Sequence, residues 1–294
     1  MLLLLLLATS RAATPTKQKD ERLAAHRIDP SSRGCYAFLQ YGHPSDLLFA
    51  STAAGLLSLL RPRRTTQRVV LLLTEAWWHT RYESLFSKLG AHVQRTPEVK
   101  NVGCSGPFRK GNHFVGSYTH SAAWGLSALC DSVVAMDSDL QVMRSMDHVF
   151  DFMSEHRQVQ TVGLQLNWPE MNVGVQLLRP NTSVHRQLVE YIQRPNALRG
   201  YQGYACGKGY QLAAKGFFSV YFGRPRWFSR WSLRYNCMDK LSGNCLKTCD
   251  ECDPALEREH LQHVFVVHWP GDLKPHGASS PPLEAGSSHL PAFD

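Results

Sequence analysis

Apolar runs alternate with amphipathic segments along the first half of the chain. The runs 36–39, 68–74 and 91–93 predict strands, and the segments 47–60 and 80–89 repeat their apolar residues at helical spacing. Continuous apolar strands separated by helices are typical of a parallel sheet with helices on both faces. We therefore predict an α/β fold in which helices flank a Rossmann-like, mostly parallel central sheet within a single domain.

The second half of the chain is less regular. Its apolar residues predict two more strands at 158–164 and 172–178 and a helix at 183–193. Asn181 or Thr182, directly before that helix, is expected to cap its first turn because both carry a side-chain oxygen that can accept from the backbone. These elements are assigned to the same domain.

A helix predicted at 118–129 leads into an apolar strand at 133–136, which ends in Asp137-Ser138-Asp139. Because side chains alternate along an extended backbone, the two carboxylates point the same way. Mg²⁺ and Mn²⁺ take such oxygens and usually complete their shell with phosphates and water. The pair therefore indicates a metal site for a phosphate-bearing ligand, although a solvated turn is the more frequent origin of an isolated Asp-x-Asp triplet.

A second apolar strand, at 264–267, ends in His268, and Lys274 follows across a Pro-Gly turn. A neutral imidazole at a strand end is a good third ligand for Mn²⁺, and a lysine at this spacing could fold back toward the same phosphates. A single histidine at such a position is more often structural. Its combination with the two aspartates favours the metal interpretation.

In this order the landmarks resemble the glycogenin-like glycosyltransferases, family 8 of the retaining nucleotide-sugar enzymes with the GT-A fold. The resemblance runs from about Cys35 to Pro275 and includes the strand with Met171-Asn172-Val173-Gly174-Val175. It implies transfer of a hexose from a nucleoside diphosphate sugar to an acceptor hydroxyl with retained anomeric configuration. A UDP-sugar is the expected donor. The resemblance also implies a metal-dependent reaction.

The resemblance assigns roles to individual residues. It implies that Mn²⁺ or Mg²⁺ is bound by Asp137, Asp139 and His268. It places donor binding at Leu39, His120, Ser138, Asn172, Gly271 and Lys274. It places the catalytic contributions at Asp139, Lys274 and Gln202.

The chain departs from the family pattern at several positions. His120 stands where the family commonly has a lysine, and Tyr201 replaces the acid of the family's Gly-Asp-Gln loop in the Gly200–Gly203 match. Gly209-Tyr210-Gln211 is a rival match for that loop. These departures leave the donor sugar open and motivate an alternative function: a catalytically inactive GT-A-fold protein of the secretory pathway that binds sugars or partners.

Eight cysteines are present, and four of them cluster late in the chain at Cys237, Cys245, Cys249 and Cys252. Four neighbouring thiolates could hold a tetrahedral Zn²⁺, but two disulfides are favoured in a secreted chain. The other four cysteines cannot be paired from the sequence. Cys130, at the end of an apolar helix, is expected to be a buried free thiol.

The composition is that of a globular protein, with 43% hydrophobic and 19% charged residues. A formal charge of +8 suits nucleic acid, an acidic surface or an anionic substrate, but no nucleic-acid reading motif accompanies it, so we expect no nucleic-acid partner. The aromatic and basic stretch 217–235 could stack on bases, and an edge of the core is the favoured interpretation. The acceptor (glycan, lipid or protein) and homodimer formation are left open.

Three features favour the secretory pathway, either the Golgi lumen or secretion: a leucine-rich leader, an even number of cysteines and the sequon at Asn181. The leader is too short to span a bilayer, so a membrane anchor is expected to be absent or truncated. We divide the chain into a signal-peptide-like leader at 1–13, a flexible linker at 14–33, a GT-A glycosyltransferase domain at 34–276 and a disordered tail at 277–294.

Overall fold

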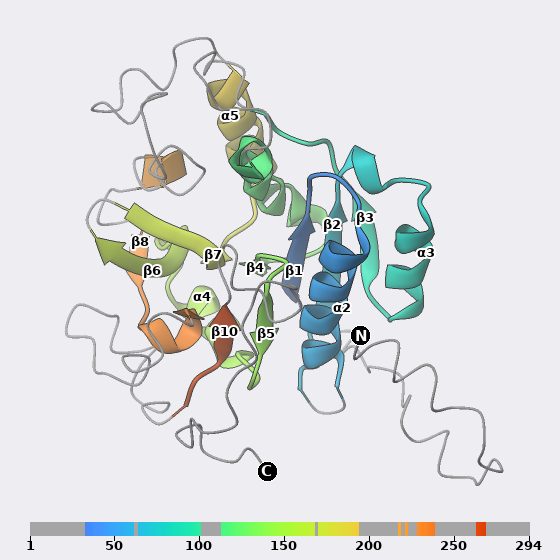
Figure 1. Cartoon of the computed structure of the whole chain (residues 1–294). Coiled ribbons are helices and arrows are strands. Elements are labelled where there is room, and N and C mark those ends of the chain that lie inside the picture. The colour runs from blue at the N-terminus through green and yellow to red at the C-terminus, as the bar shows by residue number, and fades with distance from the viewer. Residues whose placement is uncertain are drawn as a thin grey trace, which may run out of the picture.

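Two sheets organise the computed structural model. It describes residues 33–61, 64–100, 113–167, 170–193, 217–218, 221–222, 228–238 and 263–268. The larger sheet has seven strands in the order β3-β2-β1-β4-β7-β6-β8, and the smaller has three in the order β5-β10-β9 (Figure 1). The α/β architecture with helices around a central sheet confirms the predicted fold class.

The first half of the chain forms the parallel part of the larger sheet. Its strands are β1 (Gly34–Gln40), β2 (Arg68–Leu73), β3 (His92–Arg95) and β4 (Ser132–Met136). The helical segments between them are α2 (Asp46–Leu60), η3 (Glu75–Trp77), α3 (Arg81–Lys88) and η4 (His113–Ala128). Every residue of β1 and β4 is buried, as expected for strands covered on both faces. The segment predicted as a helix at 118–129 lies in η4, which has 3₁₀ hydrogen bonding.

The second half of the chain contributes further strands to the same sheet and the helices beside them. These elements are α4 (His148–Glu155), β6 (Thr161–Asn167), β7 (Glu170–Leu178), α5 (Thr182–Gln193) and β8 (Phe228–Arg230). Strand β7 runs antiparallel to both β4 and β6, so the sheet is mostly but not wholly parallel. Asn181 Oδ1 accepts from the backbone N–H groups of Ser183 and Val184, which makes Asn181 the cap of α5.

The smaller sheet joins segments that are far apart in the sequence. Its strands are β5 (Leu140–Val142), β9 (Cys237–Met238) and β10 (Val266–His268), and the short helix η7 (Leu233–Tyr235) precedes β9. Strand β10 pairs antiparallel with β5 and parallel with β9. Of these strands only β10 was predicted from the sequence, because it overlaps the apolar run 264–267. Strands β5 and β9 are too short to show a pattern and have no such run beside them.

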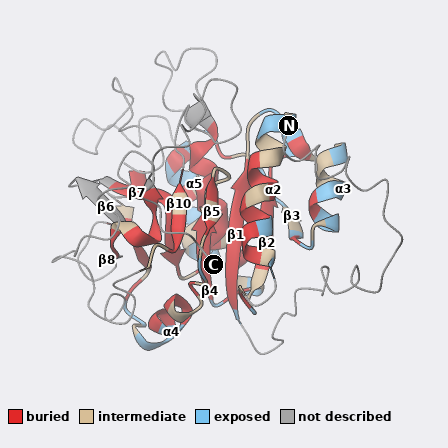
Figure 2. Ribbon diagram, turned by 60° about the horizontal axis from the view of Figure 1, so that its bottom comes forward, coloured by how far each residue is buried: buried red, intermediate tan, exposed pale blue. Residues whose placement is uncertain are grey.

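The core lies on both faces of the larger sheet, where Figure 2 shows buried strands beneath helices whose outer surfaces are exposed. Alternation along β1 divides its side chains between the two layers: Tyr36 and Phe38 belong to one cluster and Ala37 to the other. Within the aromatic stretch 217–235, Trp231 and Tyr235 are 0% exposed. This stretch therefore contributes to the core, as the favoured interpretation had it.

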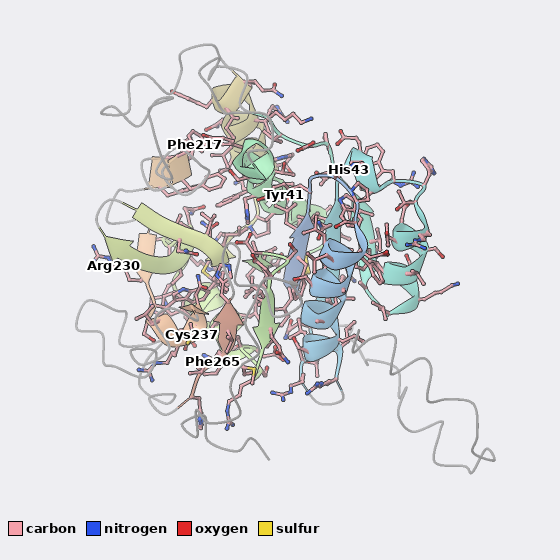
Figure 3. All side chains as sticks on the ribbon, in the orientation of Figure 1. Tyr41, His43, Phe217, Arg230, Cys237 and Phe265 are labelled. Carbon is pink, nitrogen blue, oxygen red and sulfur yellow. A yellow bond between two sulfur atoms is a disulfide. The ribbon has the colours of Figure 1, made fainter. Side chains whose placement is uncertain are left out.

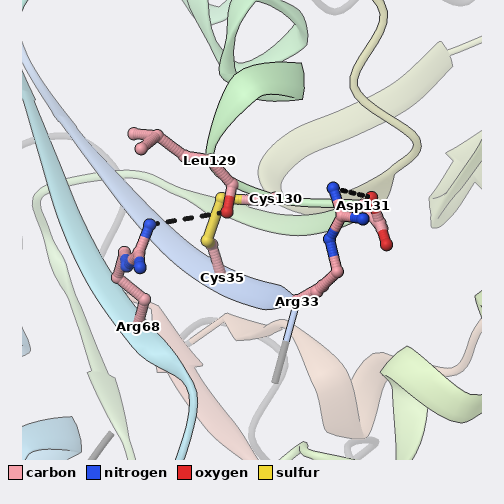
Figure 4. The surroundings of a disulfide bond; sticks show 6 residues. All are labelled: Arg33, Cys35, Arg68, Leu129, Cys130 and Asp131. Carbon is pink, nitrogen blue, oxygen red and sulfur yellow. Dashed lines mark hydrogen bonds and ion pairs between the residues drawn. A yellow bond between two sulfur atoms is a disulfide. The ribbon is translucent and has the colours of Figure 1, made fainter. Parts of the chain in front are cut away.

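The prediction that Cys130 is a free thiol is wrong, because it forms a disulfide with Cys35 (Figure 4). Strands β1 and β4 are neighbours, with Cys35 opposite Val133, so the turn before β4 passes beside Cys35. The sequence pattern does not reveal this pairing of strands. An ion pair of 2.9 Å between Arg33 and Asp131 flanks the bond.

Cys237 is also disulfide-bonded, which favours disulfides over a zinc site for the late cysteine cluster. The other members of that cluster, Cys245, Cys249 and Cys252, lie outside the described residues, as do the predicted leader and tail. Within the described part of the chain, no helix combines the length and the apolar character needed to cross a bilayer.

Candidate metal centre

Strand pairing brings three predicted ligands to one point. Asp137 follows the last residue of β4, and its backbone N–H donates to Gly174 O of β7 at 2.9 Å. Asp139 precedes β5, and Leu140 at the start of β5 is the register partner of His268 in β10. The two carboxylates and the imidazole therefore meet because a three-residue turn, 137–139, joins β4 to β5 and because β10 pairs with β5.

The three side chains lie close enough together to coordinate one metal ion. His268 Nε2 lies 3.2 Å from Asp139 Oδ1 and 3.6 Å from Asp137 Oδ2, and one ligand atom from each residue lies within 4.8 Å of the others. The side chain of His268 is 3% exposed, whereas those of Asp139 and Asp137 are 13% and 25% exposed. The cluster therefore opens to solvent on the carboxylate side, where a ligand would approach.

The donor set fits a divalent cation. Two carboxylates and an imidazole are ligands that Mn²⁺ accepts, and Mg²⁺ accepts the carboxylates. Three protein ligands leave positions for phosphate oxygens or water, as in sites that bind a metal together with a phosphorylated substrate. The described residues contain no other such cluster of three. That these residues bind a metal stays a prediction.

His120 belongs to the same cluster, although the sequence analysis predicted that it binds the nucleotide-sugar donor. It is 3% exposed, and its Nε2 lies 2.8 Å from Asp137 Oδ1, on the carboxylate oxygen that does not face His268. The ring of Tyr41, which follows β1 (Figure 3), packs edge-on against the His120 ring, with 6.5 Å between the two ring centroids. Asp137 is thus held between two imidazoles, and His120 limits the rotation of this carboxylate.

Asn172 and Asn236 form a hydrogen-bonded chain behind His268. Asn236 Oδ1 lies 2.8 Å from His268 Nδ1, and Asn236 Nδ2 donates to Asn172 Oδ1, also at 2.8 Å. Asn172 Oδ1 accepts a second bond of 2.8 Å from the backbone N–H of Gly174. The sequence analysis predicted that Asn172 binds the nucleotide-sugar donor. It missed Asn236, which lies in a cysteine-rich region and belongs to no motif.

Helix α2 supports the turn that carries the aspartates. Ser51 Oγ donates to the backbone carbonyl of Ser138 at 2.9 Å. A Cβ added to Gly55 would lie 2.9 Å from Leu140 O, so only glycine allows the helix to approach β5 this closely. Ser138 therefore contributes its backbone to the architecture of the site.

Other predicted site residues are placed differently. Leu39 is 3% exposed and its side chain packs in the core, so a contact with a donor would have to come from its backbone. Gln202, Gly271 and Lys274 lie outside the described residues, together with both candidate Gly-x-Gln loops.

Known proteins resemble this chain in structure and not in sequence. No family model matches the sequence, and no curated protein matches it. The galactosyltransferase LgtC, solved in complex with donor and acceptor sugar analogs, is 15% identical over 82% of this chain and 88% of its own, with a TM-score of 0.57. Mouse xyloside xylosyltransferase 1 is 15% identical over 81% of this chain and 97% of its own, with a TM-score of 0.50.

The glycosyltransferase GlyE of Streptococcus pneumoniae is a third structural neighbour, 12% identical over 85% of this chain and 58% of its own, with a TM-score of 0.53. At such identities the likeness establishes the fold, and the roles of individual residues do not follow from it. The chain therefore has the fold of the GT-A glycosyltransferases, as its resemblance to the glycogenin-like family predicted.

Proposed function

We propose that this protein is a metal-dependent glycosyltransferase that moves a hexose from a nucleoside diphosphate sugar, most simply a UDP-sugar, to an acceptor hydroxyl with retention. One observation carries the proposal: Asp137, Asp139 and His268 converge within 4.8 Å in a fold shared with glycosyltransferases. In open α/β sheets, ligands bind beyond the carboxyl ends of the strands, which is where Asp137 follows β4.

The chemistry requires charge stabilisation at the leaving group. When bound, a divalent cation would neutralise negative charge that develops on the diphosphate as the glycosidic bond breaks. Asp137 and Asp139 would supply carboxylate oxygens to that ion and His268 would supply Nε2. The buried position of His268 would keep water away from one side of the ion.

The transfer needs no covalent intermediate with the enzyme. The bond between the anomeric carbon and the phosphate oxygen breaks, and its electron pair stays on the diphosphate. The acceptor oxygen forms the new bond on the same face of the sugar, and its proton passes to the leaving phosphate. Following the resemblance, Gly271 and Lys274 would contact the diphosphate and Gln202 the sugar.

The test is release of UDP from a panel of UDP-sugars, with and without Mn²⁺ and after chelation. We expect release that requires the metal and that falls by about 10²-fold or more in Asp139→Asn, because a charge-stabilising group at the reacting centre is lost. Asp131→Asn is the matched control, since Asp131 flanks the opposite end of β4 and is 56% exposed. Metal-independent release, or equal loss in both variants, would contradict the proposal.

One observation keeps a non-catalytic binding protein as the second candidate. His120, at the position where the family commonly has a lysine, is bonded to Asp137 at 2.8 Å, so its Nε2 is engaged within the cluster. A protein of this kind would bind UDP with Mn²⁺ and release no UDP from any donor. Calorimetry with UDP, combined with the turnover assay, separates the two candidates.

We also propose that the protein folds in the secretory pathway, in the Golgi lumen or on the way out of the cell. Support comes from the disulfide Cys35–Cys130 and from the disulfide-bonded state of Cys237, because such bonds persist in oxidising compartments. The sequon residue Asn181 is exposed and thus open to glycosylation. Expression in mammalian cells should give a product whose mass falls on glycosidase treatment, and Asn181→Gln should remove that change.

A further inference from the structure

Asn236 lies beside the predicted metal ligand His268 for a structural reason. It follows η7, where its backbone N–H donates to Leu233 O at 3.0 Å, and it precedes β9. Strand β9 pairs parallel with β10, with Cys237 opposite Val267, so Asn236 is level with the start of β10 and its side chain reaches along that strand to His268. Asn236 is 0% exposed, so its polar side chain depends on partners inside the protein.

The hydrogen-bonded chain has a direction that its first donor determines. The backbone N–H of Gly174 can only donate, so the Asn172 atom that it contacts at 2.8 Å must be the carbonyl oxygen. That oxygen accepts a second bond, also of 2.8 Å, which therefore comes from the amide nitrogen of Asn236. Asn236 is left with its carbonyl oxygen facing His268 Nδ1 at 2.8 Å.

An oxygen acceptor at this place determines where the imidazole carries its hydrogen. His268 must donate its Nδ1–H to Asn236, which leaves Nε2 as the atom with the lone pair in the neutral ring. Nε2 is the nitrogen that faces Asp139 Oδ1 at 3.2 Å and Asp137 Oδ2 at 3.6 Å. The tautomer that Asn236 selects is thus the one that can bind a cation held by the two carboxylates.

Gly174 also restricts the orientation of the ring. A Cβ built on Gly174 would lie 2.3 Å from His268 Cε1 and 2.8 Å from Nδ1, closer than real Cβ contacts. The imidazole therefore packs directly on the backbone of β7, and only glycine allows this contact. Asn172 and Gly174 act on the same histidine, one through hydrogen bonds and the other through the absence of a side chain.

We propose that Asn236 is a positioning residue for metal binding, and that Gly174, Asn172 and Asn236 form a relay that fixes the tautomer and orientation of His268. The inference rests on the metal-dependent part of the proposed function. Without the Asn236 oxygen, His268 could carry its hydrogen on Nε2 and donate it to Asp139, in the place that a cation needs. Partners of this kind typically contribute 10- to 100-fold to metal affinity.

Two substitutions at Asn236 separate positioning from structural support. Asn236→Leu removes the acceptor for His268 and the donor for Asn172. Asn236→Asp keeps an acceptor for Nδ1–H, replaces the donor for Asn172 by a second oxygen and adds a buried carboxylate. Both should lower the melting temperature, because each leaves a buried polar group without its partner. Only Asn236→Leu should weaken metal binding.

The measurement is titration of Mn²⁺ in the presence of UDP, followed by the loss of the electron paramagnetic resonance signal of free Mn²⁺. We expect Asn236→Leu to bind Mn²⁺ about 10- to 100-fold more weakly than wild type, with Asn236→Asp close to wild type. Gln176→Leu is the control, since Gln176 is a 0% exposed amide on β7 that bonds to Thr161. It should lower the melting temperature and leave Mn²⁺ affinity unchanged.

Several results would overturn the relay: unchanged affinity in Asn236→Leu, equal losses in the leucine and aspartate variants, an equal loss in Gln176→Leu, or a wild-type protein that binds no Mn²⁺. Its failure is distinct from failure of the proposed function. If the Mn²⁺ affinities are as expected but no donor is turned over, the positioning role of Asn236 is supported and the proposed glycosyltransferase activity is contradicted. If turnover depends on Mn²⁺ but substitution of Asn236 does not change Mn²⁺ affinity, the glycosyltransferase activity is supported and the positioning role of Asn236 is contradicted.

Discussion

The two ends of strand β4 are held in opposite ways. At its carboxyl end, the carboxylates of Asp137 and Asp139 lie 3.6 Å and 3.2 Å from Nε2 of the buried His268. At its amino end, the disulfide Cys35–Cys130 joins the turn before β4 to β1, and both cysteines are 1% exposed. One end concentrates negative charge that a cation would compensate, and the other is fixed covalently.

Stability and activity should therefore respond to residues at different ends of the same strand. Two carboxylates kept close together repel each other, so the site end costs stability unless a cation or an imidazolium balances it. The disulfide end stabilises the sheet without touching the site. Substitutions at the amino end should therefore change unfolding with little effect on metal binding.

The largest effect on stability is expected at the disulfide. The double change Cys35→Ala with Cys130→Ala should lower the free energy of unfolding by about 2–4 kcal/mol, because the bond closes a long loop in the unfolded chain. The sequence separation of its cysteines is 95 residues. Urea unfolding measures this change. If Mn²⁺ affinity fell in parallel at a temperature where the variant is folded, the two ends would not be independent.

Gly174→Ala tests the site end of the comparison. Its new Cβ would meet His268 Cε1 at 2.3 Å, so the imidazole must move away from β7. We expect a destabilisation of about 1–3 kcal/mol from overpacking, together with weaker Mn²⁺ binding. Thermal unfolding with and without Mn²⁺ measures both. A variant that loses stability and keeps full Mn²⁺ affinity would show that the position of the His268 ring does not matter for the metal.

Asn181→Ala removes the cap of α5 at the same edge of the sheet as the disulfide, where Leu178 pairs with Val133. The expected loss is about 1 kcal/mol of stability. Protein made in bacteria avoids any effect of a glycan on the measurement. Donor turnover should equal that of wild type, and a clear loss of turnover would mean that α5 communicates with the site.

The smallest effect is a pH dependence that arises away from the site. Burial lowers the pKa of His185, on α5 against Gly125, from its ordinary value of 6.5. The folded protein therefore holds this imidazole neutral where the unfolded chain takes up a proton, so this contribution to stability is full above pH 6.5 and declines below it. In His185→Gln, urea unfolding should depend less on pH in that window. An unchanged pH profile would exclude this origin.

The sequence was most informative where elements are long and apolar. The strands β1, β2 and β4 and the helices α2, α3 and α5 follow from periodicity, because burial on one or two faces imposes it. The short strands β5 and β9 exist through pairing with β10 and leave no pattern of their own. Helix α4 was missed, although its apolar residues Val149, Phe150, Phe152 and Met153 are buried.

The candidate site divides in the same way. Asp137, Asp139 and His268 were placed together because each stands at the end of an apolar strand. Asn236 was missed because its role depends on which strands pair, and pairing is a tertiary property. The disulfide was missed for the same reason, since Cys35 and Cys130 become neighbours only once β1 lies beside β4.

One divalent cation is expected to bind between Asp137, Asp139 and His268. The most direct measurement is an anomalous difference map from crystals grown with Mn²⁺ and UDP. We predict a single peak within coordination distance of a carboxylate oxygen from each aspartate and of His268 Nε2, and no such peak in crystals of Asp139→Asn. A peak that lacks His268, or no peak between these residues in the wild-type protein, would contradict the account.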